Sequence, residues 1–397
     1  MNRKQLTLLI ALGVVLGGLA IYFARQEKET YTASAARMGD KVVASFPIND
    51  ISQITIKQPQ SEVNLAKKND VWVVRERSDY AANFSEIAEL VRKIADLKIT
   101  QPIKLSSPAS LAKLELITPD KGTNAGTLIE FKDKDGKILK TLLLGKKHHK
   151  ESPSSSPYGG GSWPDGRYVM VGNDLQSVAL ISDAMSNVEN KPEAWLDKEF
   201  FKVEKIRAIS VVSTNATNSW KVSRETESGE WKLADAKPEE KLDTGKTSSL
   251  GSALSSATFA DVAKADAKPD ETGLDKPITA TIETFDNLTY QVKIGKKASD
   301  ENYYFQVALS GEPPKERVPG KDEKPEDKTK LDKEFKEKAT KLADKIKQEK
   351  AYEKYAYLVS KWTIDPLLKE RKDLLEEKKE EPKKDEKPAP ETKPDAK

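Results

Sequence analysis

The sequence predicts an α+β protein in which one N-terminal transmembrane helix precedes two tandem, similar β-rich domains, each a mainly antiparallel sheet with one covering helix. Three observations predict this architecture. An uncharged segment near the N-terminus is long enough to cross a membrane, short stretches of alternating apolar and polar residues recur, and the same landmarks return in order about 150–160 residues later. The length of 397 residues also exceeds one ordinary core.

The transmembrane segment comes first. The uncharged stretch Leu6–Phe23 would form a helix of about 27 Å, close to the thickness of a bilayer's hydrocarbon core. A cleaved signal peptide is the alternative, but the small-residue motif Ala33–Ala35 lies too far beyond the apolar stretch. We therefore expect an uncleaved single-pass anchor. Because the N-terminal flank is very short, we expect the bulk of the chain on the extracytoplasmic side.

The first β-rich domain begins with a strand over residues 51–56 and a hairpin that carries Trp72 on its inner face. Apolar residues then recur at intervals of three and four from Phe84 to Leu97, which predicts an amphipathic helix capped by Asn83 or Ser85. Later strands are expected at 127–131, 142–147 and 168–171.

The second domain repeats this order more weakly. A strand over 203–211 precedes a hairpin with Trp220 and Trp231, and Leu250, Leu254 and Ala257 suggest a helix. Its later strands are expected at 281–285, 292–297, 304–307 and 355–359.

Charged segments interrupt and follow the second domain. Residues 313–350 are dominated by Lys, Glu and Asp, with helical spacing from Leu331 onward, which is typical of either a solvated helix or a coiled arm. The final 22 residues lack large aliphatic side chains and should be disordered. The predicted divisions are therefore 1–29 for the anchor, 40–200 and 201–375 for the two domains, 313–350 for the insertion and 376–397 for the tail.

Composition excludes several classes of function. The chain has 67 Lys and Arg, 64 Asp and Glu, and a net charge of +3, of which residues 1–29 contribute +2. The nearly neutral remainder argues against a nucleic-acid-binding protein that relies on a basic face. The absence of Cys excludes disulfides, thiolate metal sites and a Cys nucleophile.

Few residues suggest chemistry. The sequence has no Walker A or dinucleotide-binding glycine motif. His148 and His149, with Glu151, could hold a metal, and Ser110 and Lys113 fit an S-x-x-K pattern by spelling, but solvated side chains and chance explain these features better. We predict no catalytic, cofactor-binding or metal-binding residue, and no cofactor.

One loop carries a candidate for partner binding. Residues 148–166 are rich in Ser, Pro and Gly, which predicts a surface loop, and Trp163 lies within it. Exposed Trp is enriched at protein interfaces. The alternative is that Trp163 folds back and caps the loop.

The ordered landmarks resemble those of a bacterial family catalogued only as a domain of unknown function. They are the anchor, the Trp hairpin, Tyr80 before a helix, a Leu-Gly-Lys strand ending at Lys147, Tyr168–Val171 and Trp195–Glu199. Members of that family are membrane-anchored, often carry the domain repeated, and are often encoded beside ABC-transporter components of the gliding-motility type. The resemblance covers about residues 1–310 and 352–375, and it provides no catalytic residues to transfer.

The resemblance implies a non-catalytic protein of the bacterial envelope, anchored in the inner (cell) membrane, that binds protein partners and is an accessory component of an ABC-type transport system. The expected partners are the inner membrane, through the N-terminal helix, and protein partners such as transporter subunits; no nucleic acid is expected. The alternatives are an envelope scaffold without a transporter, an enzyme acting on envelope glycans or peptides, and a small-molecule sensor.

Overall fold

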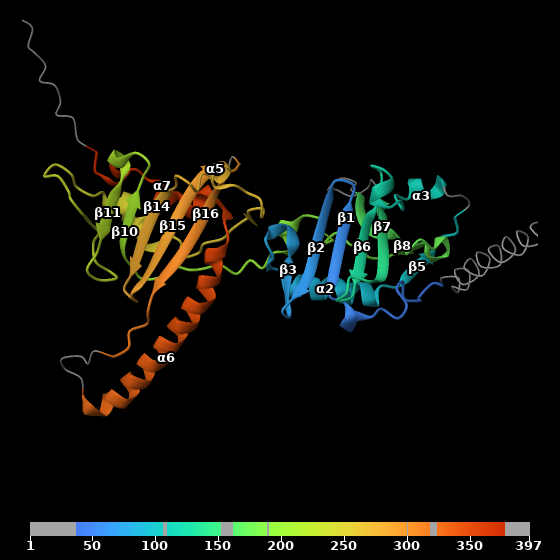
Figure 1. The fold of residues 1–397 in the computed structure, drawn as a ribbon, viewed down its shortest axis with the longest axis horizontal. Coiled ribbons are helices and arrows are strands. Elements are labelled where there is room, and N and C mark those ends of the chain that lie inside the picture. Colours follow the sequence, from blue (N-terminus) through green and yellow to red (C-terminus); the bar gives the residue numbers. More distant parts are fainter. Residues whose placement is uncertain are drawn as a thin grey trace, which may run out of the picture. The chain divides into compact units, whose positions relative to one another are not determined.

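The computed structural model describes residues 37–105, 109–151, 162–188, 190–299, 301–317 and 324–377 (Figure 1). It is a mixed helix and sheet protein with two antiparallel sheets, as the α+β prediction requires. Contacts divide the chain into two compact units. The first holds the chain through Glu199 together with Asp261–Ala267, and the second holds Phe200–Ala260 and the chain from Lys268 onward.

The predicted anchor over residues 1–29 and the tail from residue 378 lie outside the described residues. Within the part of the chain that the structure describes, no helix has the length and apolar character needed to span a membrane.

The first sheet has nine described strands in the order β4-β3-β2-β1-β6-β7-β8-β9-β5. Their bounds are β1 (Gln53–Gln58), β2 (Ser61–Lys68), β3 (Val71–Val74), β4 (Tyr80–Ala81), β5 (Ile99–Pro102), β6 (Thr127–Lys132), β7 (Ile138–Glu151), β8 (Ser162–Val171) and β9 (Ala179–Ile181). The β1–β2 register places Ile54 opposite Leu65 and Ile56 opposite Val63, and all four side chains are buried. Period-two alternation therefore sets the core face of this hairpin.

The predicted amphipathic helix is confirmed as α2 (Phe84–Asp96), shown in Figure 1. The Asn83 side chain accepts the backbone N–H groups of Ser85 and Glu86, which satisfies two donors that the helix start would otherwise leave free. One face of the helix is buried, through Ile87, Leu90, Val91, Ile94 and Ala95. The shorter α3 (Ala109–Lys113) follows β5.

The second sheet has eight described strands in the order β12-β11-β10-β14-β15-β16-β17-β13. Their bounds are β10 (Ile206–Val212), β11 (Trp220–Ser223), β12 (Lys232–Leu233), β13 (Asp261–Val262), β14 (Ile278–Thr284), β15 (Leu288–Lys297), β16 (Asn302–Gly311) and β17 (Tyr357–Ser360). The two sheets are similar at their far edges, which end in β9-β5 and β17-β13. In each pair the outermost strand, β5 or β13, comes earlier in the sequence than its neighbour.

The helix predicted around Leu250 and Leu254 does not form as a continuous helix. The segment contains α4 (Thr244–Thr247), a 3-10 turn at Ser248–Ser252, and then Leu254 with a positive φ of 59°. Ser and Gly dominate this stretch, and both residues have a low helix propensity. The apolar side chains still reach the core, since both leucines are buried.

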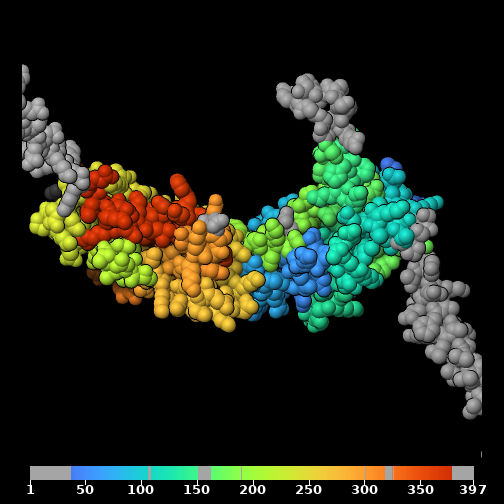
Figure 2. Space-filling model, turned by 90° about the horizontal axis from the view of Figure 1, so that it is seen from above, coloured from blue at the N-terminus to red at the C-terminus, as the bar shows by residue number. Residues whose placement is uncertain are grey.

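The segment that closes the second unit lies against its first strands, as Figure 2 shows for the residues coloured red and yellow-green. The segment consists of β17, α7 (Lys361–Leu368) and a 3-10 turn at Arg371–Leu374. The Trp220 Nε1–H donates to the Lys369 carbonyl oxygen at 2.7 Å, and Leu375 pairs with Leu242. The chain therefore returns to the same core after the charged insertion.

The insertion contains α6 (Pro325–Glu349), which extends from the second unit in Figure 1. Its C-terminal part packs against that unit, because Leu342 and Ile346 are buried and Lys345 forms an ion pair with Glu204. Earlier residues of the helix are mainly exposed. The sequence left open whether residues 331–350 pack on a domain, and the structure answers this for the last turns.

A buried carboxylate fixes this end of α6. Glu349 is 8% exposed and accepts the Tyr290 hydroxyl at 2.7 Å and the backbone N–H of Lys202 at 3.1 Å. Burial raises the pKa of Glu349 above its ordinary 4.5, and Glu204 adds to the shift, whereas the two hydrogen bonds and Lys345 oppose it. Burial and the neighbouring carboxylate also raise the pKa of Tyr290.

We expect Glu349→Gln to gain stability relative to the wild type as the pH rises above about 4.5. The pKa of Glu349 is higher in the folded than in the unfolded chain, so the unfolded chain releases this proton first as the pH rises. The wild type therefore loses folding free energy between the ordinary and the raised pKa, whereas the uncharged glutamine does not. Denaturant unfolding at pH 4.5 and 7.5 measures the difference. The exposed Glu337→Gln on the same helix is the control, and an equal response of both variants would contradict the expectation.

Candidate protein-binding groove

Three large apolar side chains of the first unit remain exposed at neighbouring positions. Phe84 is 65% exposed, Val71 is 53% and Ile48 is 47%. They come from the start of α2, from β3 and from a 3-10 turn at Ile48–Asp50. Trp72, which is nearly buried, contributes to the lining beside all three. Exposed apolar groups gathered in this way are typical of interaction surfaces.

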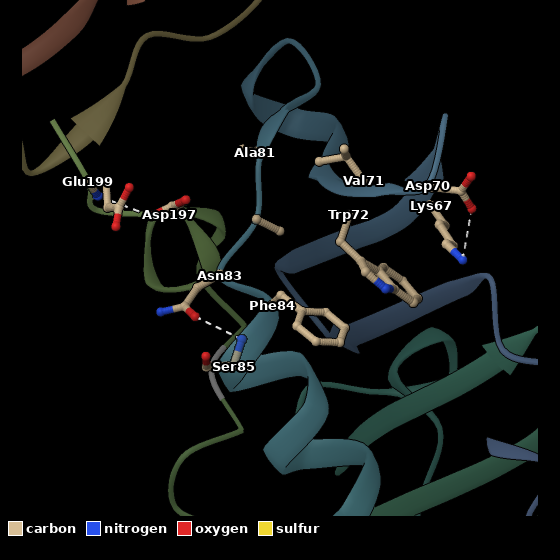
Figure 3. Close-up of a pocket in the computed structure, with 11 residues that line it drawn as sticks. Lys67, Asp70, Val71, Trp72, Ala81, Asn83, Phe84, Ser85, Asp197 and Glu199 are labelled. Atoms are coloured by element: carbon tan, nitrogen blue, oxygen red, sulfur yellow. Dashed lines mark hydrogen bonds and ion pairs between the residues drawn. The ribbon is translucent and has the colours of Figure 1, made fainter. Parts of the chain in front are cut away.

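Local structure explains how these side chains reach the surface. The two-residue turn between β2 and β3 uses Asn69 and Asp70, both with positive φ, as a type I′ hairpin requires. The turn places Val71 and Trp72 on opposite faces of β3. Phe84 is the first residue of α2 and follows the cap Asn83, so its ring extends outward beside Trp72 (Figure 3).

Two hollows lie on either side of these rings and share Lys67, Trp72 and Phe84. The first, of about 370 Å³, is here called the apolar groove. Its apolar lining includes Ile48, Ile51, Trp72, Phe84, Ile87 and Val91, and Lys67 and Arg92 supply positive charge.

The second, of about 680 Å³, is here called the acidic hollow, because Asp70, Asp197 and Glu199 line it (Figure 3). Lys67 forms an ion pair with Asp70 at 3.1 Å, at the boundary of the two hollows. The lining of the apolar groove suits an apolar segment, and the lining of the acidic hollow suits a polar or basic one.

A metal-binding cluster is lacking among the residues that the structure describes. These residues contain no group of three or more His, Asp or Glu side chains suited to a metal ion. The acidic hollow therefore gathers negative charge without a group suited to hold a metal ion.

The loop predicted over 148–166 is wrong at both ends. β7 continues through Glu151 and β8 begins at Ser162, with His148 opposite Gly166 and Lys150 opposite Trp163. The Ser, Pro and Gly content of this segment predicted a loop, whereas pairing across the ladder, which includes two register shifts, extends both strands. The intervening residues 152–161 lie outside the described residues.

His148, a metal-binding candidate of the sequence, forms a hydrogen bond with Asp165. Its Nδ1 lies 2.6 Å from Asp165 Oδ1, and this hydrogen bond lowers the pKa of Asp165. The neighbouring His149 Nδ1 lies 3.2 Å from the Lys147 carbonyl oxygen.

Trp163, the partner-binding candidate of the sequence, is 48% exposed on β8. Four strands separate β8 from β3 in the sheet order, so the structure does not bring Trp163 to the groove. Sequence reasoning missed the groove because it assigned Phe84 to the apolar helix face. One feature of the sequence could have indicated the exposure of Phe84. It directly follows a capping residue, and the first residue of a helix can extend beyond the sheet that covers the rest of the helix.

The fold is of the α+β class, with two antiparallel sheets. A family model described as a domain of unknown function, DUF4340, matches residues 72–277, which is more than half of the chain. The chain therefore belongs to this family, and the predicted resemblance to a domain of unknown function is confirmed. The match begins at Trp72 in the groove and continues into the second unit. No significant match was found among curated proteins or solved structures.

Proposed function

We propose that this protein is a non-catalytic, membrane-anchored protein of the bacterial envelope that binds a protein partner through the apolar groove. The single observation that carries the proposal is the exposure of Phe84, Val71 and Ile48 around the apolar groove and the adjoining acidic hollow, which share Phe84. Water contact with such side chains is unfavourable, and covering them with a partner would release that cost.

The proposed partner is a subunit of an ABC-type transport system, which makes the protein an accessory component. The charge of the groove suggests the form of the contact. Because Lys67 and Arg92 flank an apolar lining, a partner segment with apolar side chains and an acidic flank would be complementary. The anchor over residues 1–29 would hold the protein in the same membrane as the transporter.

We further propose that the two units are copies of one domain. In support, the order β3-β2-β1-β6-β7-β8-β9-β5 corresponds strand by strand to β12-β11-β10-β14-β15-β16-β17-β13. Both copies also have a register shift at a Gly-Lys-Lys sequence, after Leu144 in one and after Ile294 in the other. Such bulges are usually retained between related domains.

An envelope scaffold without a transporter is the second candidate. The observation that favours it is the length and exposure of the charged helix α6, which could contact other envelope components. Deletion of residues 325–341 would separate the two, because the accessory function through the groove does not require this part of the helix.

We expect Phe84→Glu to lower co-purification of transporter subunits about tenfold or more, because it places a charge where an apolar contact forms. A glutamate in the first turn of a helix is favourable for the fold, so the variant should remain as stable as the wild type. The measurement is affinity purification of the full-length chain after crosslinking in intact cells.

Trp163→Glu provides the matched control, since it changes another exposed aromatic residue of the same unit. Loss of the subunits with this variant but not with Phe84→Glu would move the binding surface to the β7–β8 hairpin. Unchanged recovery with both variants would refute the groove.

A further inference from the structure

The second unit exposes the most solvent-accessible of the large apolar side chains that the structure describes. Trp362, in the first turn of α7, is 89% exposed. It lies beside a hollow of about 450 Å³, within the range of small-molecule sites. The protein-binding groove of the first unit does not explain this residue.

The lining of this hollow consists mainly of hydroxyl groups. It contains Ser249, Ser252, Ser255, Ser256, Thr258, Ser360, Trp362, Thr363, Asp365 and Pro366. Each hydroxyl can donate one hydrogen bond and accept two. Asp365 is the only charged side chain in the lining, so the hollow is weakly acidic and otherwise neutral.

The fold directs these hydroxyls to the surface. Ala257 and Phe259 are buried, whereas the alternate residues Ser256 and Thr258 are exposed, as in an extended segment with one face on the core. The Ala260 N–H donates to the Leu358 carbonyl oxygen at 2.8 Å, which holds this segment beside β17.

Some of the hydroxyls already have partners within the fold. Ser360 caps α7 by accepting the Thr363 N–H, and Ser249 accepts from Lys369. The hydroxyls of Ser255, Ser256 and Thr258 make no hydrogen bond to any side chain or backbone group that the structure describes. These three remain for a ligand.

We propose that this hollow binds a neutral saccharide. A sugar ring has an apolar face of C–H groups that stacks on an indole, and a rim of hydroxyls that exchange hydrogen bonds with Ser and Thr side chains. The combination of an exposed Trp362 with a hydroxyl-lined hollow fits both features. A protein-binding hot spot would instead have mainly apolar neighbours, and Asp365 disfavours an acidic sugar.

Isothermal titration calorimetry of the purified full-length chain tests this proposal. The probes are maltotriose, cellotriose and tri-N-acetylchitotriose as neutral saccharides, and trigalacturonic acid as the acidic comparison. We expect saturable binding of at least one neutral probe and binding at least about tenfold weaker for the acidic one.

The variants locate the site. Trp362→Ala should weaken neutral-saccharide binding about tenfold or more, and Trp362→Phe should restore most of the affinity, because it keeps an aromatic face. Trp163→Ala, which removes an exposed Trp of the first unit, should have no effect. Absence of saturable binding for every neutral probe, or equal affinity of Trp362→Ala and the wild type, would overturn the proposal. If Trp362→Ala loses saccharide binding but still co-purifies with transporter subunits, the proposed protein-binding function is unaffected.

Discussion

Phe201→Ala should lower the free energy of unfolding by about 3–5 kcal/mol, the cost typical of removing a large aromatic side chain from a core. Phe201 is 1% exposed and stacks on Phe305, with ring centroids 5.9 Å apart and an interplanar angle of 10°. The centroid of the Phe201 ring also lies 4.6 Å from that of Phe200 and 5.9 Å from that of Tyr290. Because these neighbouring rings are bulky and rigid, most of the cavity should persist.

Equilibrium denaturation of the full-length chain measures this loss. Phe84→Ala is the control, because Phe84 is 65% exposed and its truncation should change stability by only about 0.5 kcal/mol. A loss below about 1 kcal/mol for Phe201→Ala would contradict the packing of the second core.

Gly145→Ala and Gly295→Ala should each destabilise their own unit by about 1–3 kcal/mol, the usual cost of forcing atoms into a packed region. A Cβ at Gly145 would overlap the backbone carbonyl of Leu114, and a Cβ at Gly295 would overlap that of Thr272. A backbone carbonyl cannot rotate away as a side chain can. The equal effect in both units follows from the proposed duplication, because each glycine occupies the same place beside a register shift.

Hydrogen exchange measured by mass spectrometry assigns each loss to a unit, since faster exchange should be confined to the sheet that carries the substitution. Gly122→Ala is the control, because a Cβ there has open space around it. If one glycine tolerates alanine and the other does not, the two sites are not equivalent, and the duplication loses its most specific support.

Local patterns predicted the elements that depend on neighbouring residues. The period-two alternation around Ile54 and the cap Asn83 gave a strand and a helix close to their observed bounds. The helix expected near Leu250 was wrong because burial of its leucines does not require a helix when Ser and Gly favour turns. The ends of β7 and β8 were missed because pairing across the sheet, rather than composition, extends them.

The sequence carried only one signal for the candidate groove, the position of Phe84 directly after its cap, because the groove depends on tertiary exposure. Phe84 has the spacing of a core residue, yet its place at the helix start leaves it in solvent. For Trp163 the sequence left exposure and a folded-back position open; the side chain is 48% exposed, and nothing in the sequence indicated its distance from β3 along the sheet.

Site-specific photocrosslinking in intact cells tests the proposed docking of the apolar groove most directly. A photoreactive amino acid at position 84 of the full-length chain should form an adduct with a membrane-embedded subunit of an ABC-type transporter. The same amino acid at the exposed position 337 of α6 should not. Adducts at position 84 with no transporter subunit, or equal labelling from both positions, would contradict the proposed docking through the apolar groove.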